Sequence, residues 1–296
     1  MTCFVILHYM TENETISSIE SILNNVVGRK KIIVVDNGSS NDSGSYLIEK
    51  YKDNIDVDVI ISKDNVGFAK GNNIGYRYAV TTYNPDFIVI INNDVEIYQK
   101  DFIKKISDIY QEERYAILSP DIYSTFSKVH QSPKRLTSLT YDEVKKNYKK
   151  FSFYDRSKIF IPIKCFIKEC QTIKKFVQNL KFKSRNIDYE KIYYNVPIHG
   201  SCFIFSKDFI NKRKNAFFEG TFMYYESEIL DYECHRDNLK TMYNPDVKVN
   251  HHHSVSSAQS YKSELKRNRF LNKCMKDSLK SFLNIMEKDL VSKDEV

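Results

Sequence analysis

The segment that decides the fold is Ile88-Val89-Ile90-Ile91-Asn92-Asn93-Asp94-Val95. Its apolar, β-branched first half follows a Pro85-Asp86 turn signal and predicts a strand buried on both faces of a parallel sheet. The run then breaks into three polar residues, and in open α/β sheets ligands bind beyond the carboxyl ends of strands. Asp94 is therefore placed to hold a cation, and a cation there can hold a diphosphate. The alternative is an ordinary strand-to-loop transition in which Asn and Asp serve turn chemistry.

Two further strands with polar ends precede this segment. Cys3–Leu7 and Lys31–Val35 are apolar and β-branched, and each is followed by a polar loop. The first loop begins with His8 and Tyr9. The second, Asp36 to Ser40, is typical of a nucleotide-base or ribose site and equally of an ordinary turn. Because strand ends of successive β-α units meet at one edge of the sheet, we expect these loops to converge.

A Gly-rich and Asn-rich stretch, Asp64–Gly75, follows another predicted strand, Val57–Ile61. We expect a loop here that leads into a helical segment at Tyr76–Val80. Glycines let the backbone approach a ligand closely, and a helix start offers amides to an anion. The stretch matches neither the dinucleotide pattern Gly-x-Gly-x-x-Gly nor a Walker loop, which argues against both of those sites.

Composition limits the class of protein. The chain has 296 residues, of which 42% are hydrophobic and 28% charged, as in a globular protein of one large or two smaller domains. No apolar run reaches the roughly 18 residues that span a bilayer. Met1–Leu7 lacks a basic start and a cleavage site, so we expect no signal peptide. The six cysteines include no Cys-x-x-Cys pair, which favours reduced thiols in a cytoplasmic protein over disulfides or zinc.

The net charge of +7 is concentrated in one region. Residues 126–195 contain 17 Lys or Arg and 6 Asp or Glu, interleaved with aromatic and aliphatic residues. We expect a basic helical insertion, solvated and packed on the sheet. The alternatives are an insertion that lies on an anionic membrane or binds a phosphorylated lipid, and one that binds nucleic acid. A further helix, predicted at Lys262–Met286, could pack on the core, pair with a second subunit or touch the membrane.

Three motifs in fixed order resemble family 2 glycosyltransferases of the GT-A fold, most of all the rhamnosyltransferase-like enzymes of bacterial surface-polysaccharide synthesis. They are Val34-Val35-Asp36-Asn37-Gly38-Ser39, Asn65-Val66-Gly67-Phe68-Ala69-x-Gly71-Asn72-Asn73-x-Gly75, and Asn92-Asn93-Asp94. The resemblance implies an α/β GT-A domain over 1–255, with a mixed sheet flanked by helices and the basic insertion at about 126–195. Residues 256–296 would form a C-terminal helical extension.

The resemblance also implies a donor site. Asn92 stands where the first Asp of the usual Asp-x-Asp motif is expected, so we assign it to the ribose rather than to the cation. Gly200 and Ser201 form a small-residue pair near the donor sugar and the acceptor. The residues assigned to the nucleotide and donor are Tyr9, Asp36, Asn65, Gly67, Asn73, Asn92 and Asn93.

The catalytic base and one of the metal ligands come from the second half of the chain. The family places an acidic pair at a helix start, where the helix terminus stabilises a carboxylate. Glu226 aligns with its first member, and Ser227 stands where Asp is expected, so Glu226 is the preferred base and Glu228 the alternative. The spacing of the family selects His251 as a metal ligand beside Asp94. Oxygen ligands suit Mg²⁺, whereas an imidazole favours Mn²⁺.

The function that these features imply is inverting transfer of a sugar by single displacement. The donor would be a nucleotide-diphospho-sugar, UDP-linked first and dTDP-linked second. The acceptor would be a hydroxyl of a saccharide, or of one linked to polyprenyl diphosphate, in capsule or cell-surface polysaccharide synthesis. We expect a cytoplasmic protein, with peripheral attachment to the inner face of the membrane as one arrangement and a homodimer as another. The alternatives are a non-catalytic sugar-nucleotide-binding or assembly partner, suggested by Ser227, and a basic protein that binds membrane or nucleic acid, of which nucleic acid is disfavoured.

Overall fold

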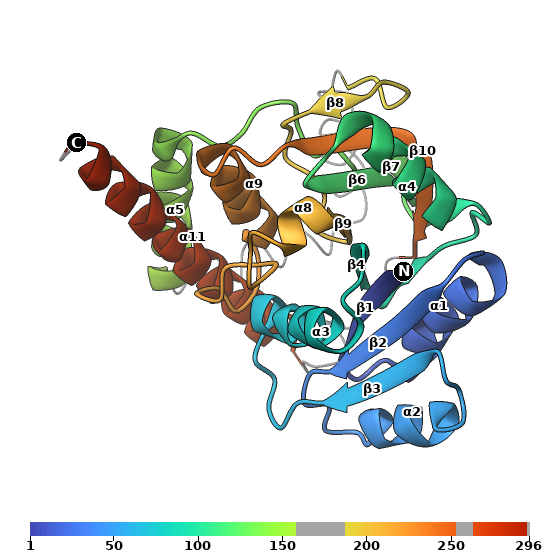
Figure 1. The fold of residues 1–296 in the computed structure, drawn as a ribbon. Coiled ribbons are helices and arrows are strands. Elements are labelled where there is room, and N and C mark those ends of the chain that lie inside the picture. Colours follow the sequence, from blue (N-terminus) through green and yellow to red (C-terminus); the bar gives the residue numbers. More distant parts are fainter. Residues whose placement is uncertain (158–186, 253–262, 295–296) are drawn as a thin grey trace. The chain divides into compact units, whose positions relative to one another are not determined.

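The computed structural model describes residues 1–157, 187–252 and 263–294 (Figure 1). The chain divides into two compact units. The first comprises Met1–Ser138, Tyr189–Glu219 and Glu226–Ser254. The second comprises Leu139–Asp188, Gly220–Tyr225 and Val255–Val296. The first unit contains the sheet, and the described part of the second is mainly helical.

A mixed sheet forms the centre of the first unit, in the order β3-β2-β1-β4-β9-β6-β10-β5. Strands β1 to β4 run parallel to one another, whereas β9 runs antiparallel to both β4 and β6. Two short strands lie off this path, β7 beside β6 and β8 beside β10. The strands are β1 (Thr2–His8), β2 (Lys30–Asp36), β3 (Val57–Ile61), β4 (Phe87–Asn92), β5 (Val95–Glu96), β6 (Ile117–Ser124), β7 (Val129–His130), β8 (Tyr193–Tyr194), β9 (Cys202–Ser206) and β10 (Thr241–His251).

Helices cover both faces of this sheet. One apolar cluster joins one face to α1, α2 and α4, and a second joins the opposite face to α3, α8 and α9. Along β4 the side chains of Ile88 and Ile90 enter the second cluster, and those of Val89 and Ile91 enter the first. The prediction that this strand is buried on both faces is therefore confirmed. The helices are α1 (Glu12–Asn25), α2 (Ser43–Tyr51), α3 (Phe68–Tyr83), α4 (Phe102–Glu113), α8 (Lys207–Ile210) and α9 (Glu226–Arg236).

The Gly-rich stretch differs from the prediction. We expected a loop up to Gly75, but α3 already begins at Phe68. Two of its glycines bring this helix onto β1, because a Cβ at Gly71 would lie 2.6 Å from Leu7 Cδ1 and one at Gly75 would lie 2.4 Å from Val5 Cγ1. The spacing of four residues places both glycines on one helix face. They serve close packing of helix on strand, which the composition alone did not distinguish from a ligand-binding loop.

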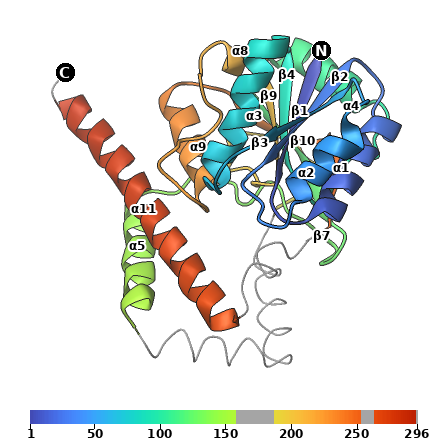
Figure 2. The ribbon, with the colours of Figure 1, turned by 90° about the horizontal axis from the view of Figure 1, so that it is seen from below.

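The second unit contains α5 (Tyr141–Arg156) and α11 (Glu264–Asp294), which lie side by side (Figure 2). Thr140 begins α5 with a capping box, in which its side chain accepts from the Glu143 N–H and Glu143 reaches back. Lys276 of α11 pairs with Asp155 of α5 at 2.5 Å. The C-terminal helix is thus present. The predicted insertion contains α5, and its segment 158–186 lies outside the described residues.

In the part of the chain that the structure describes, no helix is both long enough and apolar enough to cross a membrane. Four cysteines, Cys3, Cys202, Cys234 and Cys274, are free and buried, as expected. The other two lie in the segment that is not described.

Candidate active site

Polar residues from three parallel strands meet at one edge of the sheet, as the sequence predicted. The register pairs His8 at the end of β1 with Asp36 at the end of β2. Leu7 of β1 pairs with Asn92 at the end of β4. The loop after β3 joins the same edge, because the Ser62 N–H donates to the Asp36 carbonyl at 2.8 Å.

Asn37 holds two of these loops together. Its side-chain amide donates to Asn65 Oδ1 at 3.1 Å, and its Oδ1 accepts the Val66 N–H at 3.0 Å. Gly38, with φ +72°, allows the close approach, because a Cβ there would lie 2.5 Å from the Asp64 carbonyl carbon. Asn37 belongs to the motif Val34–Ser39, for which the sequence predicted no role at this position. Its place next to Asp36 at a strand end was the available signal.

The side chain of Asp36 is enclosed by its own loop. Its Oδ1 accepts the Ser39 N–H at 3.2 Å and the Ser39 hydroxyl at 2.5 Å. Its Oδ2 lies against Gly44, where a Cβ would be only 2.2 Å away. Asp36 is accordingly 2% exposed, whereas Tyr9 and Asn65 are half-buried. In this structure the latter two offer more surface to a nucleoside.

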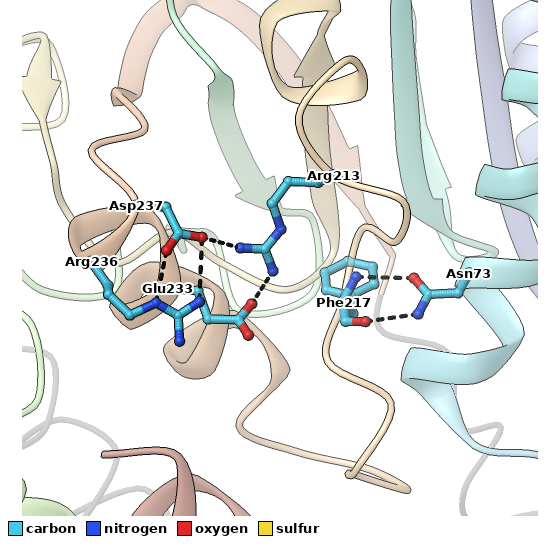
Figure 3. Close-up of polar contacts among 6 residues, drawn as sticks. All are labelled: Asn73, Arg213, Phe217, Glu233, Arg236 and Asp237. Carbon is cyan, nitrogen blue, oxygen red and sulfur yellow. Dashed lines mark hydrogen bonds and ion pairs between the residues drawn. The ribbon is translucent and has the colours of Figure 1, made fainter. Parts of the chain in front are cut away.

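Two asparagines assigned to the donor are buried in local networks. Asn73 donates to the Phe217 carbonyl at 2.7 Å and accepts the Phe217 N–H at 3.0 Å (Figure 3). Asn93 donates to the hydroxyls of Thr11 and Thr15 at 2.7 and 3.1 Å. Gly67, with φ +85°, caps the start of α3. The side chains of Asn73 and Asn93 thus connect elements around the site.

His8 is fully buried beneath this edge. Its ring nitrogens lie 2.7 Å from the Thr15 hydroxyl and 2.8 Å from the Ser43 hydroxyl. Burial lowers the pKa of His8, and the nearby carboxylate of Asp36 only partly opposes this. His8 therefore links α1 to α2 as a neutral imidazole.

Asp94 and His251 meet at the same side of the sheet. The His251 Nε2 lies 3.2 Å from the Asp94 Oδ1, and their side chains are 7% and 10% exposed. The backbone sets this distance: β5 pairs antiparallel with β10 so that Val95 faces His251, and the His252 N–H donates to the Asp94 carbonyl at 2.8 Å. The two residues selected as metal ligands are thus adjacent.

The neighbouring histidine makes a separate pair. The His252 Nε2 lies 2.9 Å from Glu96 Oε2, and its Nδ1 lies 2.9 Å from the Thr125 hydroxyl. Residues 1–157, 187–252 and 263–294 contain no group of three or more His, Cys, Asp or Glu arranged to hold a metal. Asp94 and His251 are therefore a two-residue donor set, one oxygen and one nitrogen. Such a set fits a cation whose other ligands are diphosphate oxygens and water.

Gly200 lies between His199 and Ser201. Among the described residues, a Cβ there would meet no atom within 4 Å. The neighbouring Ser201 is buried, and its carbonyl accepts the Asn92 N–H at 3.0 Å, which ties the start of β9 to the end of β4. His199 Nδ1 lies 2.9 Å from the Ser201 hydroxyl, and its ring lies 5.9 Å from that of His251. The structure thus brings His199 next to the predicted metal ligand His251.

The acidic segment lies at the start of α9, as predicted. Glu226 is its first residue and is 8% exposed. Glu228 is held by cations, with Lys134 Nζ at 3.0 Å and Arg135 Nη2 at 3.6 Å. Burial would raise the pKa of Glu228, but Lys134, Ser227 and Arg135 outweigh it, so that this pKa lies below its usual value. A carboxylate held in this way is a weaker base than one without such partners.

Segment 211–219 is fixed on two sides. Arg213 lies between Glu233 of α9 and Asp237, which follows the last residue of that helix (Figure 3). Its Nη1 donates to Asp237 Oδ2 at 2.8 Å. On the other side Asn73 of α3 holds Phe217. These contacts keep α9 in a defined position on the sheet, and with it Glu226.

The sequence model of glycosyl transferase family 2 matches residues 3–180 of this chain. The chain belongs to glycosyl transferase family 2. The predicted family is therefore confirmed, and with it a glycosyltransferase. A relative, the low-salt glycan biosynthesis hexosyltransferase Agl10 of Haloferax volcanii, is 26% identical over 275 residues, which is 90% of this chain and 73% of the relative.

Solved structures share the fold of this family 2 glycosyltransferase. S. aureus TarS 1-349 superposes with a TM-score of 0.52 at 13% identity, over 92% of this chain and 64% of that chain. The same protein in complex with UDP gives a TM-score of 0.53 at 12% identity, over 90% and 67%. A longer TarS structure gives 0.53 at 11% identity, and this chain spans 41% of it. The likeness confirms the predicted mixed α/β fold.

Proposed function

We propose that this glycosyltransferase is metal-dependent and inverting, and that it moves a sugar from a nucleotide-diphospho-sugar to a hydroxyl of a saccharide or a lipid-linked saccharide. The observation that carries the proposal is the contact between Asp94 and His251 at the carboxyl edge of the sheet. The donor nucleotide would lie over the strand ends with Tyr9, Asp36 and Asn65, and with Asn92 at the ribose. The residues Gly67, Asn73 and Asn93 would support the nucleotide-binding residues without being the main contacts of the donor.

The leaving group of such a donor is a nucleoside diphosphate, whose negative charge must be neutralised as the glycosidic bond breaks. Asp94 and His251 would hold Mn²⁺ or Mg²⁺, which supplies that neutralisation when bound. The oxygen of Asp94 suits both ions, and the imidazole of His251 favours Mn²⁺. The surroundings are largely dry, since both side chains are at most 10% exposed, and this strengthens the interaction with charge.

The base in this proposal is Glu226. It would take the proton from the acceptor hydroxyl as that oxygen attacks the anomeric carbon from the face opposite the diphosphate. A single displacement of this kind needs one catalytic carboxylate. Glu228 is the less suitable candidate because Lys134 and Arg135 already neutralise it. The space that the described residues leave at Gly200 would admit the sugar or the acceptor.

UDP is our first choice of nucleotide, with dTDP second. TarS, a protein of the same fold, has been solved in complex with UDP, which supports this order. The name of the Agl10 relative supports a hexose as the transferred group and a glycan as the product.

The experiment is a thermal-shift series with UDP, dTDP and GDP, each with and without Mn²⁺, followed by transfer assays with the corresponding sugars. We expect the midpoint to rise with UDP plus Mn²⁺ and the Asp94→Asn variant to lose this rise. A metal-dependent response to GDP alone would overturn the choice of nucleotide. The absence of any nucleotide response would favour a non-catalytic assembly partner.

We also propose that α5 lies on an anionic membrane surface, where a lipid-linked acceptor would be found. Lys145, Lys146 and Lys149 line a hollow of about 360 Å³ together with Asp142. Phe153, at an interval of one helical turn beyond Lys149, is 59% exposed. Lysines beside an exposed aromatic residue suit lipid headgroups and the acyl boundary. On α11, exposed Leu290 and Val291 offer a surface for a second copy, which sedimentation velocity would detect.

Cosedimentation with vesicles containing phosphatidylglycerol tests the membrane proposal. We expect Lys145→Glu/Lys149→Glu to weaken binding, whereas the control Lys104→Glu, at an exposed position of α4, should not. Binding to oligonucleotides in place of vesicles, with a steep salt dependence, would favour nucleic acid instead.

A further inference from the structure

A short segment before α5 contacts several parts of the candidate site. Its first residue, Gln131, reaches His251, and the hydroxyl of Ser132 accepts the His199 N–H at 3.3 Å. Lys134 donates from its backbone to the Pro197 carbonyl at 3.0 Å, and its Nζ reaches Glu228. This segment lies within the predicted basic insertion at about 126–195, for which the sequence predicted no part in the active site. The contact between Gln131 and His251 affects how His251 can bind a cation.

Gln131 determines which nitrogen of His251 carries the hydrogen. Its Oε1 lies 2.7 Å from His251 Nδ1. An amide oxygen only accepts hydrogen bonds, so Nδ1 is the donor. In a neutral imidazole the other nitrogen, Nε2, then carries a lone pair.

That lone pair faces a carboxylate. The His251 Nε2 lies 3.2 Å from Asp94 Oδ1, and two acceptors at this distance repel unless a proton or a cation lies between them. His251 Nε2 and the Asp94 carboxylate would together hold a divalent cation placed there. Gln131 thus leaves His251 in the state that a cation shared with Asp94 requires.

We infer that Gln131 is a positioning residue of this site: by accepting the Nδ1–H of His251 it fixes the tautomer and ring orientation with which Nε2 and Asp94 bind a divalent cation. Outer partners of this kind raise the basicity of a ligating imidazole, and their loss typically weakens metal binding about 10–100-fold. The inference rests on the proposed function, because it takes His251 as a ligand. It adds a residue that acts through His251 without touching the cation.

The test measures Mn²⁺ affinity in the presence of UDP, by calorimetry or by the electron paramagnetic resonance signal of free Mn²⁺. Gln131→Met keeps the length of the side chain but cannot accept the hydrogen bond, and Gln131→Glu restores an acceptor. The matched control is Gln99→Met, because Gln99 also bonds β10 but through the backbone of Asp246 and Lys248. Nitrogen chemical shifts of ¹⁵N-labelled histidine report the tautomer of His251 without metal.

We expect Gln131→Met to weaken Mn²⁺ binding about 10–100-fold and to lose the single Nδ1–H signature, while Gln131→Glu and Gln99→Met keep wild-type affinity or better. Equal losses in Gln131→Met and Gln131→Glu, with a lowered melting temperature in both, would show a merely structural role and overturn the inference. If Gln131→Met binds normally while His251→Ala does not, the inference fails and the proposed function stands. If His251→Ala also binds Mn²⁺ normally, both fail.

Discussion

The imidazole of His251 lies 3.2 Å from the carboxylate of Asp94, although one ends β10 and the other follows β4. The antiparallel pairing of β5 with β10 creates this contact. The two-residue strand β5 therefore brings the end of β10 to the carboxyl edge of the parallel strands. His252 and Glu96 form a second histidine–carboxylate pair next to it, and this pair serves as the control for Asp94 and His251.

We expect Asp94→Asn and His251→Ala each to lower kcat/KM by about 100-fold or more and to abolish the effect of Mn²⁺ on UDP binding. His252→Ala is the matched control, since it removes the neighbouring imidazole and its ion pair. Its effect should stay below about tenfold. Transfer assays with a Mn²⁺ titration check this, and a larger loss for His252→Ala than for His251→Ala would contradict the assignment.

Glu226→Gln should lower kcat by about 10²–10⁴-fold while leaving the affinity for UDP unchanged, because a general base acts on the acceptor and not on the donor. Glu228→Gln should instead act on folding. It leaves Lys134 and Arg135 without their carboxylate, and we expect a loss of about 2–3 kcal/mol in the free energy of unfolding. Steady-state kinetics and urea denaturation of both variants separate the two roles. Full activity in Glu226→Gln would eliminate it as the base.

The stabilisation from Glu228 should depend on pH. Burial opposes ionisation, but the neighbouring cations hold the pKa of Glu228 below its usual 4.5. A group whose folded pKa is depressed stabilises the protein fully above its unfolded pKa and loses that effect as the pH falls through the folded value. The difference in unfolding free energy between wild type and Glu228→Gln should therefore be constant above about pH 5.5 and shrink below about pH 4.5. A difference that grows on acidification would contradict the ion-pair interpretation.

Much of this arrangement could be predicted from local patterns. The parallel strands, their polar ends and the start of α9 follow from apolar runs, turn residues and acidic residues at a helix start. The inward orientation of Asn73 could not, because it depends on Phe217, which is far away in the chain. The same holds for Gln131, whose partner lies on β10. Side-chain partners across the sheet have no signature in a single sequence, whereas strands and helices do.

Alanine substitutions at Gly75 and Gly200 distinguish a glycine needed for packing from one proposed to make room for a ligand. Gly75→Ala places a Cβ 2.4 Å from Val5 Cγ1, so overpacking of about 1–3 kcal/mol should outweigh the gain in helix propensity. The Cβ of Gly200→Ala meets no atom of residues 1–157, 187–252 or 263–294 within 4 Å, and this variant should change the free energy of unfolding by less than about 0.5 kcal/mol.

Gly200→Ala should affect catalysis and not stability. Gly200→Ala fills space that we assign to the sugar or acceptor, so kcat/KM should fall although the protein remains stable. Thermal denaturation and transfer assays measure the two quantities. An active Gly200→Ala variant with unchanged KM for donor and acceptor would remove this residue from the site.

The central claim is that Asp94 and His251 share one divalent cation beneath the donor diphosphate. The most direct measurement is an anomalous difference map from crystals grown with UDP and Mn²⁺. We predict one strong peak within about 2.3 Å of both Asp94 Oδ1 and His251 Nε2, in contact with the diphosphate oxygens. Bound UDP with no peak between these two atoms, or with its Mn²⁺ on other residues, would contradict the account.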